Sequence, residues 1–81
     1  MDSQPFFTLS ALDEGAEARV RALHLSGGMR RRLQDLGLVA GTRVTCLQRA
    51  CSGDPTAYRI RGAVIALRTD DTARIEIGGA P

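Results

Sequence analysis

The order of apolar and polar residues along the chain predicts several short strands. In the segment 16–22, Ala18, Val20 and Ala22 alternate with charged residues, which is typical of a strand with one buried face. The alternation changes phase at Leu23, and one extra residue in a strand produces such a shift. We therefore expect this strand to contain a bulge near Ala22.

The segments 42–48 and 73–77 show the same period of two. Their apolar residues are expected to face inward: Val44, Cys46, Ala73, Ile75 and Ile77. Residues 9–12 are too few for more than a single helical turn.

The segment 57–68 predicts a hairpin, because two apolar runs flank the turn pair Arg61-Gly62. A two-residue turn pairs Ile60 with Ala63 and sets the register of both strands. The face expected to point inward carries Tyr58, Ile60, Ala63, Ile65 and Leu67. The opposite face carries Arg59, Arg61, Val64, Ala66 and Arg68.

One segment has a helical period. Its apolar residues recur at intervals of four and three: Met29, Leu33 and Leu36. Ser26 stands at the N-cap position, and Gly37 stands where a left-handed residue ends a helix and lets Leu38 contact Leu33. We expect the far side of this helix, which carries Arg30, Arg31 and Gln34, to make no contacts with the fold.

These elements predict an all-β fold with a short helix, arranged as a small barrel closed on itself. A chain of 81 residues is expected to form a single domain, 1–81. Its core is expected over about 9–77, with loose tails at 1–5 and 78–81.

The composition is that of a globular protein, with 43% hydrophobic and 25% charged residues. All 11 basic residues are arginine, but a net charge of +2 is too small to indicate nucleic-acid binding. The sequence has no apolar run of membrane-spanning length and no basic, apolar leader at its start. We expect a cytoplasmic protein.

The residues offer little for catalysis or metal binding. His24 has no acidic partner that the sequence reveals, so we expect no enzyme activity. His24, Cys46 and Cys51 are weak candidates for a metal site, because structural zinc usually takes four ligands in paired spacing. We expect Cys46 to pack in the core and Cys51 to lie in a turn.

Several motifs together resemble the family of ferrous iron transport protein A (FeoA). They are Arg32-Leu33, Leu36-Gly37-Leu38, Gly41, Val44, Gly53-Asp54-Pro55, Gly62 and Ala66-Leu67-Arg68. The similarity runs from about Leu9 to Ile77. The chain departs from the pattern at Cys51 and at Gly27-Gly28, where the helix begins.

The resemblance implies an SH3-like barrel and a cytoplasmic accessory to a membrane ferrous-iron permease that carries a GTP-binding domain. The corresponding hypothesis is a non-enzymatic module that docks on the cytoplasmic part of this FeoB-type permease and regulates it, at the inner membrane. The residues expected to contact the permease are Arg30, Arg31, Gln34, Arg59, Arg61 and Arg68. Alternatives are a small barrel that binds nucleic acid through its arginine face, and a metal carrier or sensor. No cofactor is expected to be required, with weak binding of Fe²⁺ or Zn²⁺ as the metal alternative.

Overall fold

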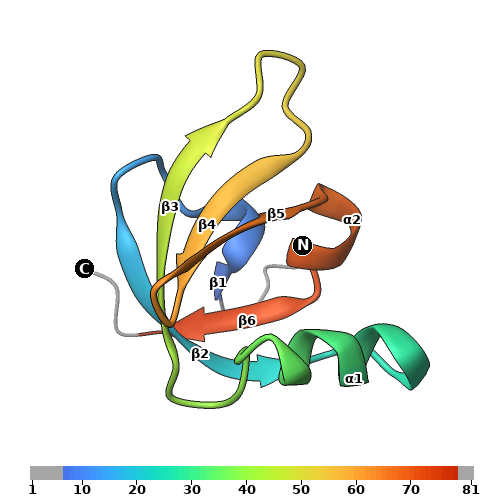
Figure 1. Ribbon diagram of the computed structural model, residues 1–81. Helices are drawn as coiled ribbons and strands as arrows, with labels where there is room; N and C mark the ends of the chain where they lie inside the picture. Colours follow the sequence, from blue (N-terminus) through green and yellow to red (C-terminus); the bar gives the residue numbers. More distant parts are fainter. Residues whose placement is uncertain (1–6, 79–81) are drawn as a thin grey trace, which may run out of the picture.

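The computed structural model of the protein describes residues 7–78 and shows one antiparallel sheet that curves around a core (Figure 1). In chain order the elements are β1 (Phe7–Thr8), the 3-10 turn η1 (Leu9–Ala11), β2 (Glu17–Leu23), α1 (Gly27–Asp35), β3 (Arg43–Arg49), β4 (Thr56–Ile60), β5 (Ala63–Leu67), α2 (Thr69–Thr72) and β6 (Ile75–Gly78). The strand order in the sheet is β1-β6-β2-β3-β4-β5. The predicted fold class, all-β with a short helix, is confirmed.

The two ends of the sheet do not pair with each other. β1 and β5 are the outermost strands, and no strand pairing joins them within residues 7–78. β5 leads through α2 into β6, and β6 pairs with β1 and β2 instead. The expected closure of the barrel is therefore incomplete, and β5 is left as an edge strand.

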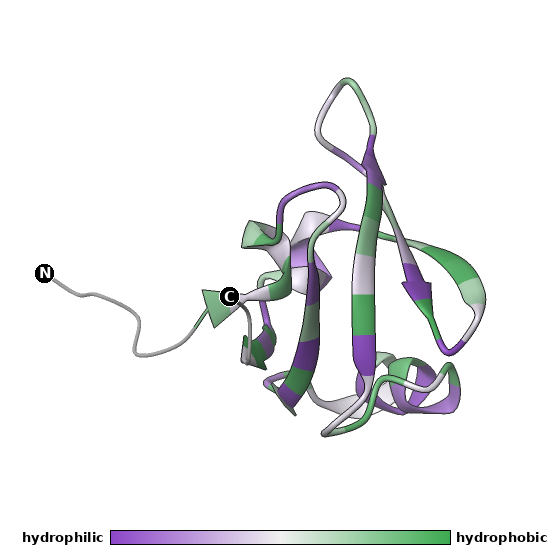
Figure 2. Cartoon of the chain, turned by 90° about the vertical axis from the view of Figure 1, so that its left-hand side faces the viewer, coloured by the Kyte–Doolittle hydropathy of each residue, from purple (hydrophilic) through white to green (hydrophobic). Residues whose placement is uncertain are grey.

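The core lies on the concave side of the sheet and is built from alternate strand residues. Figure 2 shows this alternation of polar and apolar residues along the longer strands. Val44 and Cys46 are fully buried, as the sequence predicts. The buried apolar residues of the described chain are Leu9, Leu12, Ala18, Val20, Leu23, Leu33, Leu38, Val44, Cys46, Tyr58, Ile60, Leu67, Ile75 and Ile77.

The predicted bulge in β2 is present. Val20 pairs with Ile77 and Ala22 pairs with Glu76, so Arg21 is the extra residue. The bulge shifts the alternation by one position, and Leu23 consequently reaches the core.

The predicted hairpin register between β4 and β5 is also confirmed, with Ile60 opposite Ala63. Arg61 and Gly62 have φ values of +52° and +85°, as the turn type of a two-residue hairpin requires. The inward face is covered unevenly: Ile65 packs against the core but is only half-buried, and Ala63 is exposed. Since β5 has a neighbouring strand on one side only, its side chains are covered less than those of β4.

The predicted C-terminal strand is present, with Ile75 and Ile77 buried as expected, but it begins two residues later than the sequence suggests. Residues 69–72 form α2, and Ala73 follows this helix as an exposed residue instead of opening a strand. Gly78 was expected to be loose, but it ends β6 opposite Arg19. The remaining tail residues, 1–5 and 79–81, lie outside the described residues. Among residues 7–78, no helix has the length and apolar character needed to cross a membrane.

Candidate functional site

Helix α1 ends in a hydrogen-bonding pattern that the sequence predicts. Gly37 has φ +105°, and its N–H donates to the carbonyl of Gln34 at 3.0 Å. The N–H of Leu38 donates to the carbonyl of Leu33 at 2.9 Å, and both leucines are buried. These two bonds form a Schellman motif, which satisfies carbonyls that the last turn leaves unpaired.

The apolar face of α1 is narrower than its spacing predicts. Met29 and Leu36 are 37% and 38% exposed, so only one of the three residues on the predicted apolar face, Leu33, belongs to the core. The helix has only nine residues, and Leu33 alone is buried. Ser26 has the extended backbone of an N-cap, but its side chain makes no capping hydrogen bond.

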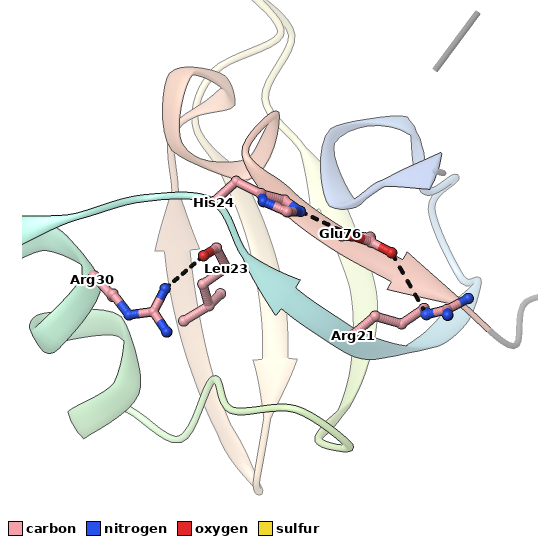
Figure 3. Close-up of polar contacts among 5 residues, drawn as sticks. All are labelled: Arg21, Leu23, His24, Arg30 and Glu76. Carbon is pink, nitrogen blue, oxygen red and sulfur yellow. Dashed lines mark hydrogen bonds and ion pairs between the residues drawn. The ribbon is translucent and has the colours of Figure 1, made fainter. Parts of the chain in front are cut away.

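The side chain of Arg30 attaches α1 to the end of β2 (Figure 3). One guanidinium nitrogen donates to the carbonyl of Leu23 at 2.7 Å and lies 3.5 Å from the carbonyl of Leu25. The expectation that Arg30 makes no contacts with the fold is therefore wrong. Arg31 and Gln34 are exposed, and within residues 7–78 neither side chain makes a hydrogen bond.

Arginines from two strands line a cleft on the outer face of the sheet. The cleft has a volume of about 530 Å³ and lies between the loop 39–42 and the turn of the β4–β5 hairpin. Its residues are Glu17, Val39, Ala40, Gly41, Thr42, Arg43, Thr45, Arg59, Arg61 and Gly62. Cross-strand pairing explains why these side chains meet: Glu17 is opposite Thr45, and Thr45 is opposite Arg59.

Only one of the three arginines that line the cleft has an acidic partner among the described residues. Glu17 pairs with Arg43 at 3.8 Å, and both side chains are more than half exposed. In the described part of the chain, Arg59 and Arg61 form no ion pair and no side-chain hydrogen bond. The cleft therefore presents two arginines that form no ion pair with a carboxylate of the described chain.

The stem of Arg61 lies against the end of helix α1. A Cβ added at Gly37 would overlap the Cδ of Arg61, so the absence of a side chain at Gly37 lets this stem pack there. Gly41 holds the opposite wall: its N–H donates to the carbonyl of Val20 at 2.7 Å, and its carbonyl accepts from Arg19 at 3.1 Å. Two glycines of the predicted motif thus shape the cleft.

Arg68 lies apart from the cleft, at the far end of β5. It precedes α2, close enough to Asp54 to contribute to the low pKa of that carboxyl. The six predicted contact residues are thus distributed over three places: Arg59 and Arg61 in the cleft, Arg30, Arg31 and Gln34 on α1, and Arg68 at the end of β5.

The Gly53-Asp54-Pro55 turn holds the start of α2. Oδ1 of Asp54 accepts from the hydroxyl of Thr69 at 2.6 Å and from its backbone N–H at 2.8 Å. These bonds, that from the hydroxyl most of all, keep the pKa of the Asp54 carboxyl below its ordinary value. Gly53 has φ +96°, and the Asp54–Pro55 peptide bond is cis.

Glu76 lies between two basic side chains, Arg21 of β2 and His24, which directly follows β2 (Figure 3). Its two carboxylate oxygens lie 2.9 Å from Nε2 of His24 and 3.6 Å from Nε of Arg21. The acidic partner of His24 was not apparent from the sequence, because 52 residues separate the two.

The comparison with known families agrees with this architecture. A family model, described as the FeoA domain, matches residues 7–78. The chain belongs to the FeoA domain family.

Relatives of this FeoA domain occur alone and within longer chains. A fusion of Fe²⁺ transport protein A with the Fe²⁺ transporter FeoB, from Porphyromonas gingivalis, is 36% identical over 69 residues. That match covers 85% of this chain but only 8% of the relative's length. FeoA of Chlorobium tepidum has a TM-score of 0.84 and 34% identity, covering 88% of this chain and 68% of that one.

A third relative supports the barrel type. FeoA of Stenotrophomonas maltophilia, a zinc complex described as a prokaryotic SH3 domain protein, has a TM-score of 0.79 and 28% identity. The similarity covers 89% of each chain. The SH3-like fold that the family resemblance implies is confirmed.

The three metal candidates of this FeoA domain do not form a common site. Cys46 is buried, and burial raises the pKa of its thiol against a smaller opposing effect of Arg49, which makes it a poorer ligand. Cys51 is exposed in the turn after β3. In the part of the chain that the structure describes, no three His, Cys, Asp or Glu side chains are grouped to hold a metal ion.

Sequence reasoning missed the ion pair of the cleft, which Arg43 and Glu17 form. The sequence pattern shows that each of these side chains lies on the outer face of its strand. Their contact depends on the register between β2 and β3, which the sequence does not show. Arg49 was missed as well: its guanidinium donates to the carbonyls of Ser10 and Leu12 and so attaches η1 to β3.

Proposed function

We propose that this chain is a non-enzymatic accessory of ferrous iron uptake that docks on the cytoplasmic part of a FeoB-type permease. Docking shifts the permease between states, and a bound protein can do so only by binding one state more tightly than another. The chain then acts in the cytoplasm at the inner membrane, held there by its partner.

The fusion in Porphyromonas gingivalis carries the proposal. That relative joins a segment 36% identical to this chain to a FeoB transporter. A linker keeps two modules at a high effective concentration, so even a weak contact between them is occupied. Two separate chains must supply the same contact through affinity, which requires a docking surface on the smaller partner.

The arginine cleft is the surface that we assign to docking. Arg59 and Arg61 are held there without a carboxylate partner from the described chain, and Val39 adds an exposed apolar side chain. Arg61 also holds a left-handed backbone that costs about 1 kcal/mol or more for a residue other than glycine. The conformation of the turn favours glycine, asparagine or aspartate at this position. The presence of an arginine there supports a role of its side chain in recognition.

Arg31, Gln34 and Arg68 remain in the proposal as an outer part of the docking surface. Arg30 belongs to it only through its effect on the position of α1. An acidic surface on the permease is expected to be attracted to these arginines before contact, which mainly raises the association rate.

The test is an affinity measurement between this protein and the purified cytoplasmic domain of the permease from the same organism. The double variant Arg59→Glu and Arg61→Glu should bind at least tenfold more weakly, mainly through slower association. Arg74→Glu is the matched control, because Arg74 is exposed and does not line the cleft. Equal weakening by the control would refute the cleft as the docking surface, and absence of binding by the wild type would refute docking.

No metal is part of this proposal. We infer that docking is unchanged after treatment with a chelator, because the described residues offer no common site to His24, Cys46 and Cys51. Loss of binding after chelation and its recovery with Fe²⁺ or Zn²⁺ would favour the metal-sensor alternative instead. The zinc in the Stenotrophomonas maltophilia complex makes this comparison worth performing.

A further inference from the structure

Strand β5 is an edge strand that lacks the usual protection of exposed edges. Its sequence, Ala63-Val64-Ile65-Ala66-Leu67, has no charged residue, no proline and no bulge. Edge strands normally carry such features, because an unprotected edge pairs with other chains. Val64 is 61% exposed, and Ala63 and Ala66 are exposed as well.

The hairpin register determines which backbone groups of β5 point outward. With a two-residue turn, Ile60 and Ala63 form a hydrogen-bonded pair, and such pairs recur at every second position. Ala63, Ile65 and Leu67 therefore direct their N–H and C=O groups to β4. Val64 and Ala66 direct theirs away from it, and no backbone hydrogen bond from another described segment reaches residues 63–67.

The charged side chains beside this edge are basic. Val64 lies directly opposite Arg59, so the two side chains stand on the same face of the sheet. Arg61 lines the same cleft as Arg59 at one end of β5, and Arg68, whose backbone is extended, continues the alternation of Val64 and Ala66 at the other end. A strand added to β5 would lie about 9.6 Å from β4, which an arginine and a glutamate can span together.

We infer that β5 binds an extended acidic segment of the partner protein, which adds to the sheet as a further strand. The N–H and C=O groups of Val64 and Ala66 hydrogen-bond with its backbone. Its acidic side chains lie on the outer face, where Arg59, Arg61 and Arg68 attract them. This inference rests on the proposed docking function and specifies the kind of segment that the permease would present.

A second copy of this chain fits the edge less well. Two β5 strands paired edge to edge would bring the arginine rows of both copies to the same junction, and like charges there oppose association. An acidic segment satisfies the same backbone groups and neutralises the arginines as well.

The experiment uses a capped octapeptide that alternates glutamate with valine, titrated into the isotope-labelled protein. We expect hydrogen exchange of the amides of Val64 and Ala66 to slow at least tenfold at saturation, with little change at α1. A peptide that alternates lysine with valine should bind at least tenfold more weakly. Protection confined to another element, or equal binding of the two peptides, overturns the inference.

Backbone pairing is tested separately from charge. The peptide N-methylated at its glutamates and the peptide N-methylated at its valines should differ in affinity for the protein. Only one of the two sets of N–H groups faces β5 and is needed for pairing. Equal binding by both methylated forms excludes strand addition. Slowed exchange of Val64 and Ala66 that grows with protein concentration, in the absence of peptide, would assign the edge to a second copy.

A protein variant links this edge to the permease. Ala66→Pro removes an N–H that does not bond with β4 and obstructs the edge, while Ala66→Thr keeps that N–H. We expect Ala66→Pro to weaken binding of the peptide and of the permease domain at least tenfold, and Ala66→Thr to bind normally. If the permease domain binds wild type and Ala66→Pro equally, docking stands and strand addition is wrong. If the acidic peptide protects β5 but the permease domain does not bind, strand addition stands and the proposed function is wrong.

Discussion

Gly37 carries two constraints at a single residue. Its φ of +105° is costly for any residue with a Cβ, and a Cβ there would also overlap the stem of Arg61. We expect Gly37→Ala to lower the free energy of unfolding by about 2 kcal/mol, because both the backbone strain and the displaced arginine contribute. Chemical denaturation of the variant and the wild type measures this difference.

Gly41 is the matched control for that prediction. Its φ is +94°, but a Cβ there would meet no atom within 4 Å. Gly41→Ala should therefore show only the backbone cost, about 1 kcal/mol. Equal losses in the two variants would mean that the contact between Gly37 and Arg61 adds nothing to stability.

Asp54 makes stability depend on pH. Hydrogen bonds from Thr69 lower the pKa of its carboxyl in the folded state, so the charged form stabilises the fold. This contribution is present above the unfolded pKa of about 3.9 and is lost as the pH falls through the lower folded value. Asp54→Ala should thus be less stable than the wild type at pH 7, with a difference that narrows below about pH 4. Denaturation midpoints across this range test it, and a constant difference would contradict the assignment.

Helix α1 depends on contacts outside its own sequence. It begins with two glycines, buries one leucine and lacks a side-chain N-cap, so the helix is weak by itself. The hydrogen bond from Arg30 to the carbonyl of Leu23 is a tertiary contact that holds it. We expect Arg30→Ala to lower the free energy of unfolding by about 1 kcal/mol and Arg31→Ala to leave it nearly unchanged. Equal effects in thermal unfolding would contradict the anchoring role.

Two apolar residues of the β4–β5 hairpin differ strongly in exposure, because β5 lies at the edge of the sheet. Ile60 on β4 is fully buried, whereas Val64 on β5 is 61% exposed. Ile60→Ala should cost about 2–5 kcal/mol because it leaves a cavity in the core, and Val64→Ala should cost less than about 0.5 kcal/mol. A larger loss at Val64 would indicate that the register is shifted by one residue.

The elements that the sequence predicted well are those whose signal is local. The bulge in β2, the turn at Arg61-Gly62 and the Schellman motif at Gly37 each follow from a few neighbouring residues. The four-residue helix α2 escaped prediction because its length is too short for a period to be seen. The anchoring of Arg30 also escaped, since it depends on where the chain runs between Leu23 and Leu25.

At the scale of the whole molecule, the cleft could be predicted only in part. The exposed faces of Arg59 and Arg61 were readable, whereas Glu17, Val39 and Arg43 come from other segments that only the sheet brings together. The open edge at β5 could not be predicted for a similar reason. The sequence pattern shows where strands form, but not which two strands will lie at the edges of the sheet. Alternation gives the faces of a strand but not its neighbours.

The arginine cleft makes docking sensitive to salt in a way that distinguishes it from nucleic-acid binding. If Arg43, Arg59 and Arg61 each neutralised a phosphate, the affinity for a duplex would fall about 500-fold for a tenfold rise in salt. A protein partner is also held by apolar contacts and backbone hydrogen bonds, which salt screens little. We therefore expect its affinity to fall by about tenfold or less between 50 and 500 mM salt, mostly through slower association. Binding kinetics with the permease domain and with a DNA duplex, measured on the same protein, give both slopes. A steep slope with the duplex and no saturable binding of the permease domain would favour the nucleic-acid alternative.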